Sequence, residues 1–544
     1  PQFRARSPAP APPFMTIDRI EFSAVPQFAR RDVAYVSQDE RLRLFYAYPP
    51  TLAGFEQVFS DKAGDATDRA LLVRELTEQY RAFPQTSEAT RANIDALADE
   101  RTFTVITAHQ PGLFTGPLYF IYKICGVIRL AQRLNETYPD YRVVPVFISG
   151  GEDHDFKEIN HARIFGQTIS WEQEKGGSVG KLPTDSLADA LKELAELLGD
   201  GERARAAYDL IAGAYGRHET YGIATVDLVN ELFGRFGLVS ADMSRPAYKT
   251  AFRSVMEQEL FDQVSQPLVE DAQARLTAAG FSGQAHAREI NLFYLQDGRR
   301  DRIVKSVNGY GVVDAELTFS TEELRSELHE HPERFSPNVI MRPLFQESIF
   351  PNLAYVGGGG ELAYWLERKE QFKHFGLNFP LLLRRNSVLW IDGGSSKRME
   401  KLDLSPTDLL QDTDSLVRRF VDRNSENELS LKDELAQLKG LFESIAAKAE
   451  DIDPTLAKAV LAEHARQEKA VQNLEGRLHR TEKQRFDTAV NQIRSLRDKF
   501  FPNDGLQERT DNFLNIYAKH GDEMIDVLVE ALDPLEQGLV VVSE

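Results

Sequence analysis

Cysteine is nearly absent from the sequence: Cys125 is the only one in 544 residues. A single cysteine cannot form an intramolecular disulfide, which excludes a disulfide framework and fits a reducing compartment, the cytoplasm. Cys125 lies in an apolar segment, so we interpret it as a packed side chain. No apolar run approaches the roughly 20 residues that span a bilayer. We therefore expect no membrane insertion.

Basic residues are also scarce, because 64 Lys and Arg stand against 84 Asp and Glu, for a formal net charge of -20. An acidic surface repels phosphate backbones, and no large basic patch is evident, so no nucleic-acid partner is expected. The sequence lacks the GxxxxGK[ST] and HExxH motifs, which argues against a Walker-type nucleotide site and a zincin-type metal site. Residues 1–14 have no long apolar stretch and are interpreted as a disordered leader.

The remaining sequence has the composition of a globular protein and begins with a βαβ pattern. Residues 103–108 and 143–148 are predicted strands, and the apolar spacing after Pro117 predicts a helix between them. Parallel strands joined in this way place both following loops at one sheet edge, where open α/β sheets bind ligands. Further strands are expected at 237–241, 339–341, 354–356, 381–383 and 388–391. The predicted class is α/β with a parallel sheet.

Two insertions and a helical arm complete the predicted organisation of a core over residues 15–405. A helix-rich acidic segment lies near 180–230, and an antiparallel segment near 280–335 carries the hairpin signal Asp297-Gly298. Leu431, Leu435 and Leu438 begin a 4,3 spacing that is typical of a coiled coil. Asp453-Pro454 predicts the start of a second long helix that runs towards residue 500. We expect an antiparallel coiled coil over 406–510, with 511–544 packing back on the core.

The loop HQPGLFTG after the first strand is the first candidate binding site. Its glycines would let backbone amides approach an anion at the start of the following helix, and its polar side chains add donors. The alternative is a tight turn whose glycines serve backbone geometry alone. The candidate binding residues are His109, Gln110, Gly112, Thr115 and Gly116.

The loop GGEDHD after the second strand is the candidate catalytic site. Three carboxylates around one imidazole, Glu152, Asp153, His154 and Asp155, suit a general base or an ammonium-binding site. Two alternatives stay open. His154 and Asp155 with His161 could hold Mg²⁺ or Mn²⁺, although no metal-ligand motif supports this, and Asp155 could simply cap a helix.

Other polar positions are weaker candidates for substrate or nucleotide binding. The glycine run from Gly357 permits close approach of a ligand, although a flexible turn is equally consistent with it. Residues 394–399 are interpreted as a basic loop that either neutralises phosphate or is merely solvated. Arg384 and Arg385 follow the predicted strand at 381–383, and either could pair bidentately with a carboxylate. The candidates are Asn160, Gly357, Gly358, Gly359, Glu361, Tyr364, Arg384, Lys397 and Arg509.

Several of these segments occur together in one known family. TAHQPGLFTGPLYFIYK at 107–123, PVFISGGEDHDFKEINH at 145–161, SPNVIMRPLFQESIFPNLAYVGGGGELAYW at 336–365 and LQERTDNF at 506–513 resemble the bacillithiol-synthesis cysteine-adding enzyme family. The resemblance implies a Rossmann-like core related to nucleotidylyltransferases, connecting insertions and a C-terminal coiled coil. The family often has glutamine where this chain has His109, which implies a hydrogen-bonding role there.

The resemblance also implies an activity, namely joining cysteine to the amino group of glucosaminyl malate in the last step of bacillithiol formation. Malate is then a carboxylate that Arg384 or Arg385 could bind. A free carboxylate is a poor electrophile, so we expect the cysteine carboxylate to be activated and then attacked by the sugar amine. ATP or ADP and Mg²⁺ are the candidate cofactors, and the coiled coil predicts a homodimer. The alternatives are a nucleotidyl or phosphoryl transferase on the same fold and a non-catalytic coiled-coil scaffold.

Overall fold

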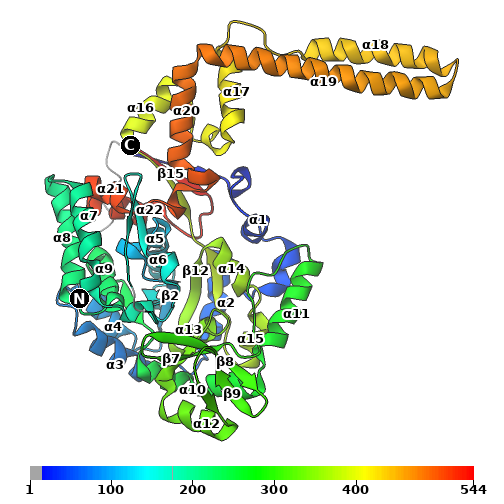
Figure 1. The fold of residues 1–544 in the computed structure, drawn as a ribbon. Coiled ribbons are helices and arrows are strands. Elements are labelled where there is room, and N and C mark those ends of the chain that lie inside the picture. Colours follow the sequence, from blue (N-terminus) through cyan, green and yellow to red (C-terminus); the bar gives the residue numbers. More distant parts are fainter. Residues whose placement is uncertain (1–14, 174–175) are drawn as a thin grey trace. The chain divides into compact units, whose positions relative to one another are not determined.

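The computed structural model describes residues 15–173 and 176–544 (Figure 1). The predicted leader, residues 1–14, lies outside this part of the chain. The chain forms two compact units, one running to Leu389 and including Gln507–Val542, the other comprising Trp390–Leu506 and the last two residues. The second unit begins at Trp390, before the boundary predicted after residue 405, because the segment that follows Trp390 packs with the helices of that unit. Within that unit, Lys499 Nζ donates to Ser395 Oγ at 3.1 Å.

A five-stranded parallel sheet forms the centre of the first unit. Its strand order is β13-β12-β2-β3-β6, which in chain order is the 3-2-1-4-5 arrangement of a doubly wound Rossmann sheet. The strand order reverses between β2 and β12, so a ligand crevice is expected beyond their carboxyl ends. The strands are β2 (Thr102–His109), β3 (Arg142–Ser149), β6 (Val239–Asp242), β12 (Asn352–Gly357) and β13 (Leu381–Arg384).

The central strands form because their apolar residues are buried on both faces. Val105, Ile106, Val144 and Val146 are all 0% exposed, as expected of a parallel sheet covered by helices. The helix α5 (Tyr119–Thr137) connects β2 to β3 and contacts both strands, while α2 (Leu52–Lys62) contacts β12 and β13. The predicted βαβ unit is therefore confirmed, with its two loops at one sheet edge.

The predicted antiparallel segment forms a second sheet of order β10-β9-β8-β7-β11. Its strands are β7 (Leu292–Gln296), β8 (Arg299–Ser306), β9 (Gly309–Val312), β10 (Leu317–Phe319) and β11 (Phe335–Pro337). The strand predicted at 339–341 is wrong, because these residues form a turn. The side chain of Asn338 accepts a hydrogen bond from Ile340 N at 2.8 Å, and this turn leads into α13 (Arg342–Ile349).

Helices make up most of the remaining first unit. The predicted helix-rich insertion contains α7 (Ala188–Leu198), α8 (Glu202–Arg217) and α9 (Tyr221–Phe233), and the C-terminal segment contains α21 (Leu514–His520) and α22 (Asp522–Ala531). β1 (Thr16–Ile20) and β15 (Leu539–Ser543) are neighbours in a smaller sheet. The other helices are α1 (Arg30–Val36), α3 (Arg69–Tyr80), α4 (Glu88–Ala96), α6 (Phe156–Ile159), α10 (Pro246–Asp262), α11 (Ser265–Ala278), α12 (Thr321–Glu330), α14 (Gly359–Trp365) and α15 (Lys369–His374).

The second unit is helical, and its longest helices form a hairpin. Figure 1 shows α18 (Lys432–Glu450) and α19 (Pro454–Arg485) side by side, and Asp453 caps α19 by accepting a hydrogen bond from Thr455 N at 2.7 Å. The second long helix does not continue to residue 500 but ends at Arg485, and α20 (Asp487–Phe500) follows. α17 (Thr413–Asn424) packs on α20.

Residues 394–399 of the second unit were expected to form a loop and instead lie in α16 (Gly393–Lys401). The side chain of Asp392 accepts a hydrogen bond from Ser395 N at 3.2 Å, and this cap allows a glycine- and serine-rich segment to begin a helix. No helix in residues 15–173 or 176–544 is long and apolar enough to cross a membrane.

Candidate active site

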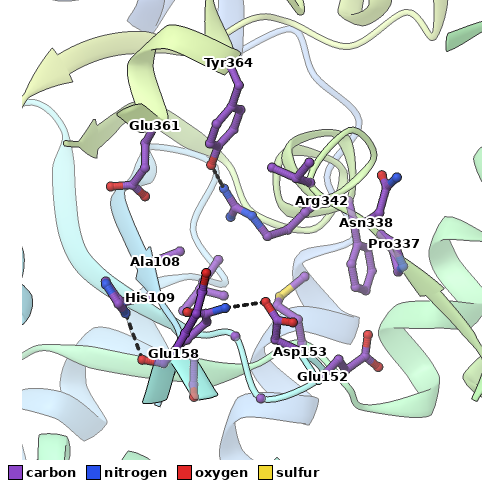
Figure 2. A pocket seen from close by; sticks show the side chains of 18 of the residues that line it. Ala108, His109, Glu152, Asp153, Glu158, Pro337, Asn338, Arg342, Glu361 and Tyr364 are labelled. Carbon is purple, nitrogen blue, oxygen red and sulfur yellow. Dashed lines mark hydrogen bonds between the residues drawn. The ribbon is translucent and has the colours of Figure 1, made fainter. Parts of the chain in front are cut away.

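A cavity of about 890 Å³ lies beyond the carboxyl ends of the parallel strands. Residues at or just after the ends of β2, β3, β6, β12 and β13 all line it, together with residues of the antiparallel sheet (Figure 2). The predicted site residues that line the cavity are His109, Gln110, Glu152, Asp153, Gly358, Gly359, Glu361, Tyr364 and Arg509. The two predicted loops thus reach one pocket, but only parts of each loop face it.

The HQPGLFTG loop splits into a pocket part and a buried part. Gly112, Thr115 and Gly116 do not line the cavity. Asn512 Nδ2 donates to the carbonyl oxygens of Phe114 at 2.9 Å and Gly116 at 2.7 Å, so the C-terminal segment fastens the turn. A side chain at Gly112 would come within 2.9 Å of the Gly116 Cα, which explains this glycine by backbone geometry. These contacts favour the interpretation of the loop as a tight turn over its interpretation as an anion-binding site.

His109 is held as a neutral imidazole at the end of β2. Burial, with a smaller contribution from the charge of Lys123, lowers its pKa to about 4. Nδ1 lies 2.9 Å from the carbonyl oxygen of Gln110, and Nε2 lies 3.1 Å from the Tyr119 hydroxyl. A proton on Nδ1 therefore donates to the carbonyl, and Nε2 accepts from the hydroxyl. The geometry favours hydrogen bonding over proton transfer by His109.

In the second loop, Glu152 is paired with a buried lysine that the sequence did not indicate. Lys249 Nζ, on α10, donates to Glu152 Oε2 at 2.7 Å and to the Phe335 carbonyl oxygen at 2.8 Å. The Ser336 hydroxyl donates to the same carboxylate oxygen at 2.8 Å. Lys249 is fully buried. Glu152 therefore joins the acidic loop to α10 and β11.

Asp153 is held in its ionised form. Burial raises its pKa, but hydrogen bonds from Gln110 and from the His154 and Asp155 amides, together with the nearby charge of Arg300, lower it overall. The His154 amide donates to Asp153 Oδ1 at 2.7 Å, and Arg300 Nη1 lies 3.9 Å from the same oxygen. A carboxylate in this state binds cations well and accepts a proton poorly at neutral pH.

His154 and Asp155 are exposed and do not line the cavity. His154 Nδ1 lies 3.0 Å from Arg300 Nη1, while Asp155 directly precedes α6. Within the described ranges, no group of three or more His, Cys, Asp or Glu side chains is arranged to hold a metal ion. The alternative metal site at His154, Asp155 and His161 therefore finds no support in the geometry.

Glu361 lines the pocket but has no free acceptor position. Lys123 Nζ donates to Oε1 at 2.9 Å and to Oε2 at 2.8 Å, while the Tyr355 hydroxyl donates to Oε1 at 2.6 Å and the Gly358 amide to Oε2 at 2.8 Å. Burial opposes its ionisation, but these partners lower its pKa to about 2. Beside it, Arg342 donates to the Tyr364 hydroxyl at 2.7 Å (Figure 2). Glu361 therefore fixes the turn between β12 and α14.

Four other predicted contacts do not line the cavity. Gly357 ends β12, and Asn160 donates to the Trp171 carbonyl oxygen at 3.3 Å. Arg384 is 2% exposed and donates to Asp32 Oδ2 at 3.2 Å, so its guanidinium has no open face for a substrate carboxylate. Lys397 belongs to α16 of the second unit.

The segment Gln507–Arg509 contains a buried ion pair. Arg385 Nη2 donates to Glu508 Oε1 at 2.7 Å, and Glu508 is completely buried. Arg509 is exposed and lines the cavity.

Sequence reasoning missed several residues that line the pocket: Asp242, Ser244, His286, Arg288, Arg300 and Arg302. Asp242 carried a usable signal, because it directly follows a predicted strand of the same sheet. The arginines carried none, since the antiparallel segment gives no indication of which face meets the sheet edge. Arg288 and Arg302 form no ion pair within the described part of the chain. Together with Arg509, they are the pocket cations best placed to meet an anion.

A Rossmann-type parallel sheet with a charged crevice at its carboxyl edge defines an α/β enzyme core, here joined to a helical-hairpin unit. The family model "Bacillithiol biosynthesis BshC, N-terminal Rossmann-like domain" matches residues 15–386, and "Bacillithiol biosynthesis BshC, C-terminal coiled-coil domain" matches 388–544. The chain therefore belongs to the BshC family. This confirms the predicted family and fold class, and it favours a ligase over the transferase and scaffold alternatives.

Curated relatives match along almost the whole chain. The "Putative cysteine ligase BshC" of Flavobacterium johnsoniae is 38% identical over 97% of this chain and 100% of its own length. Proteins of the same description from Christiangramia forsetii and Flavobacterium psychrophilum are also 38% identical, over 94% and 96% of this chain and 96% and 98% of their own lengths. A solved structure described as a putative arginyl-tRNA synthetase of Campylobacter jejuni aligns over 85% of this chain and 95% of its own, with 11% identity and a TM-score of 0.19, too low to bear on the fold.

Proposed function

We propose that the protein is a cysteine ligase that joins the carboxyl group of cysteine to the amino group of glucosaminyl malate. The relatives described as cysteine ligases support the reaction class. The observation that supports a substrate with both an amine and carboxylates is the charge distribution of the pocket. Acidic side chains follow β3 and end β6, and arginines without ion-pair partners among the described residues come from the antiparallel sheet and its flanking loop.

Arg288 and Arg302 are the best candidates to bind the malate part of the substrate. Arg302 lies opposite Phe293 in the β7–β8 pairing, and Arg300, two residues before it on β8, is anchored over the same phenylalanine ring at 4.0 Å. Side chains two residues apart in a strand lie on the same face of the sheet. The contact of Arg300 with this ring therefore also determines the face on which Arg302 lies. A planar guanidinium can pair bidentately with a carboxylate, and the two malate carboxylates would require two such partners.

Amide formation from a free carboxylate requires activation, and ATP with Mg²⁺ is proposed as the co-substrate that supplies it. The two predicted glycine loops fit a phosphate poorly. Asn512 binds two carbonyl oxygens of the HQPGLFTG loop. In the loop after β12, Gly359 lies so close to the Asp32 carboxylate that a side chain there would collide with it, and this negative charge would repel a phosphate. Arg509 is the pocket cation that belongs to the family segment LQERTDNF. It is our candidate for a phosphate contact.

The reaction is tested by the mass of its product. The purified protein is incubated with cysteine and glucosaminyl malate, with and without ATP and Mg²⁺, and the mixture is analysed by mass spectrometry. We expect a new thiol whose mass is the sum of both substrates minus one water, formed only when ATP is present. Transfer of a nucleotide or phosphoryl group to glucosaminyl malate without amide formation would instead support the transferase.

We further propose that the protein acts in the cytoplasm as a homodimer formed through the helical hairpin. The hairpin exposes large apolar side chains that nothing within the described chain covers, among them Leu456 at 46%, Leu474 at 51% and Leu478 at 42%. Their separations of 18 and 4 residues place them on one face of α19. An exposed apolar face on a long helical hairpin is typical of a self-association surface. The free and buried thiol of Cys125 fits a reducing compartment.

A further inference from the structure

Five carboxylates line the pocket: Glu152, Asp153, Glu158, Asp242 and Glu361. They differ in the groups that pair with or donate hydrogen bonds to each carboxylate. Lys249 neutralises Glu152, Lys123 neutralises Glu361, and hydrogen bonds from Gln110 and two backbone amides occupy Asp153. Glu158 is exposed, so water solvates it as it would a free carboxylate. Only Asp242 is both sheltered and without a cation partner in the described residues.

The position of Asp242 is fixed by the sheet rather than by a flexible loop. It is the last residue of β6, and in the register of the parallel sheet it lies beside Ser149, which ends β3. Gln79 Oε1 accepts a hydrogen bond from the Asp242 amide at 2.9 Å, and the Ser244 amide donates to Asp242 Oδ1 at 2.9 Å. The carboxylate is thus half-buried and held in place at the edge of the pocket.

We propose that Asp242 is the catalytic base that takes the proton from the attacking amine. The inference rests on the proposed ligase function. The ammonium group of the amino sugar transfers one proton to the Asp242 carboxylate, and the resulting amine attacks the activated carboxyl carbon of cysteine, an acyl phosphate or acyl adenylate. The C–N bond forms, the bond from that carbon to the phosphate oxygen breaks, and the second nitrogen proton leaves with the departing phosphate.

The surroundings of Asp242 suit this role better than those of Asp153. Burial raises the pKa of Asp242, the nearby negative charge of Glu152 raises it further, and the Ser244 hydrogen bonds and the charge of Arg245 lower it only in part. Lys249 and the Tyr248 hydroxyl on α10 are the other titratable groups facing it. A raised pKa makes a carboxylate a stronger proton acceptor, whereas the lowered pKa of Asp153 makes it a weaker one.

The test compares Asp242→Asn, Asp242→Glu and Asp153→Asn with Asp262→Asn, a control at the end of α10 that does not line the pocket. Single-turnover amide formation is measured at saturating substrates from pH 6 to 9, with the Kd of glucosaminyl malate measured separately. The amide introduced by Asp242→Asn keeps an acceptor for the Ser244 amide, and thermal unfolding checks each variant. At pH 7 we expect Asp242→Asn to slow amide formation about 100-fold, within the range lost with a general base.

The pH profile separates a base from a structural residue. An ordinary amine with a pKa of about 8 is mostly protonated at pH 7. Without the base, the rate should rise about tenfold per pH unit up to that pKa, so the deficit of Asp242→Asn should shrink at pH 9. Partial activity of Asp242→Glu and unchanged activity of Asp262→Asn would support the assignment. A deficit in Asp242→Asn that is the same at every pH, a wild-type rate in that variant, or a shrinking deficit in Asp153→Asn alone would overturn it. If the wild-type protein forms no amide, the ligase proposal itself fails.

Discussion

Removing Glu152 from its buried ion pair with Lys249 should destabilise the protein more than removing Lys249, and two single variants can measure these two costs. Lys249 is completely buried, whereas the Glu152 side chain is 19% exposed. Removing one partner of a buried pair costs about 3–5 kcal/mol, because the other charge is left without compensation. After Glu152→Gln, the lysine keeps neutral acceptors, the Phe335 carbonyl oxygen and the new amide oxygen, but it loses its counter-charge, so we expect the upper part of that range, about 4–5 kcal/mol.

The reciprocal variant should cost less. After Lys249→Met, Glu152 keeps the hydrogen bond from Ser336 and its access to water, so we expect a loss of about 3 kcal/mol. The double variant contains neither charge, and its cost should fall at least about 2 kcal/mol below the sum of the single costs. Burial lowers the pKa of Lys249, so the penalty of Glu152→Gln should diminish from pH 7 to pH 10 as the unpaired lysine loses its proton.

The assay is equilibrium urea unfolding followed by tryptophan fluorescence, since Trp171 and Trp365 are both buried in the first unit. The expected order of unfolding free energies is wild type, then Lys249→Met, then Glu152→Gln. Equal costs of the two single variants, a larger cost for Lys249→Met, or additive costs in the double variant would refute the asymmetric buried pair.

Three further predictions concern the pocket and the hairpin. His109→Gln should keep amide formation within about threefold, since a neutral imidazole and an amide offer similar hydrogen bonds; a loss of more than about 100-fold in single turnover would indicate proton transfer by His109. Because the pKa of Glu361 is lowered from 4.5 to about 2 in the folded protein, its stabilising contribution is present above pH 4.5 and lost as the pH falls towards 2. Glu361→Gln should remove that part of the acid sensitivity in urea titrations, and an unchanged pH dependence would contradict the coupling to Lys123. Leu474→Glu with Leu478→Glu should halve the mass measured by light scattering, whereas Gln472→Glu on another face of α19 should not; a persistent dimer would exclude this face as the interface.

Local patterns in the sequence predicted the centre of the fold. The buried strands β2 and β3 and the helix α5 between them are recognisable from apolar runs and from Pro117, and Asp453 and Pro454 mark the start of α19. Two of the departures from prediction arose where a side chain caps the backbone. The side chain of Asn338 stabilises a turn where a strand was predicted at 339–341. The side chain of Asp392 caps a helix in a segment whose glycines and serines suggested a loop.

The candidate site could be located from the sequence but not described in detail. The rule that ligands bind at the carboxyl edge of a parallel sheet correctly brought His109 and Asp153 to one pocket. The partners that decide the chemistry of each acid come from distant segments. Lys249 is 97 residues from Glu152, and Asn512 is 396 residues from Gly116. Such contacts depend on packing between elements, which local patterns do not encode.

Activation of the cysteine carboxyl group is the central claim, and isotope transfer tests it most directly. Cysteine with both carboxyl oxygens labelled with ¹⁸O is incubated with the protein, glucosaminyl malate, ATP and Mg²⁺, and the products are analysed by mass spectrometry. If the carboxylate is activated and then attacked by the sugar amine, one ¹⁸O remains in the amide and the other appears in inorganic phosphate or AMP. An amide product accompanied by phosphate and AMP without label, or no amide product at all, would contradict the account.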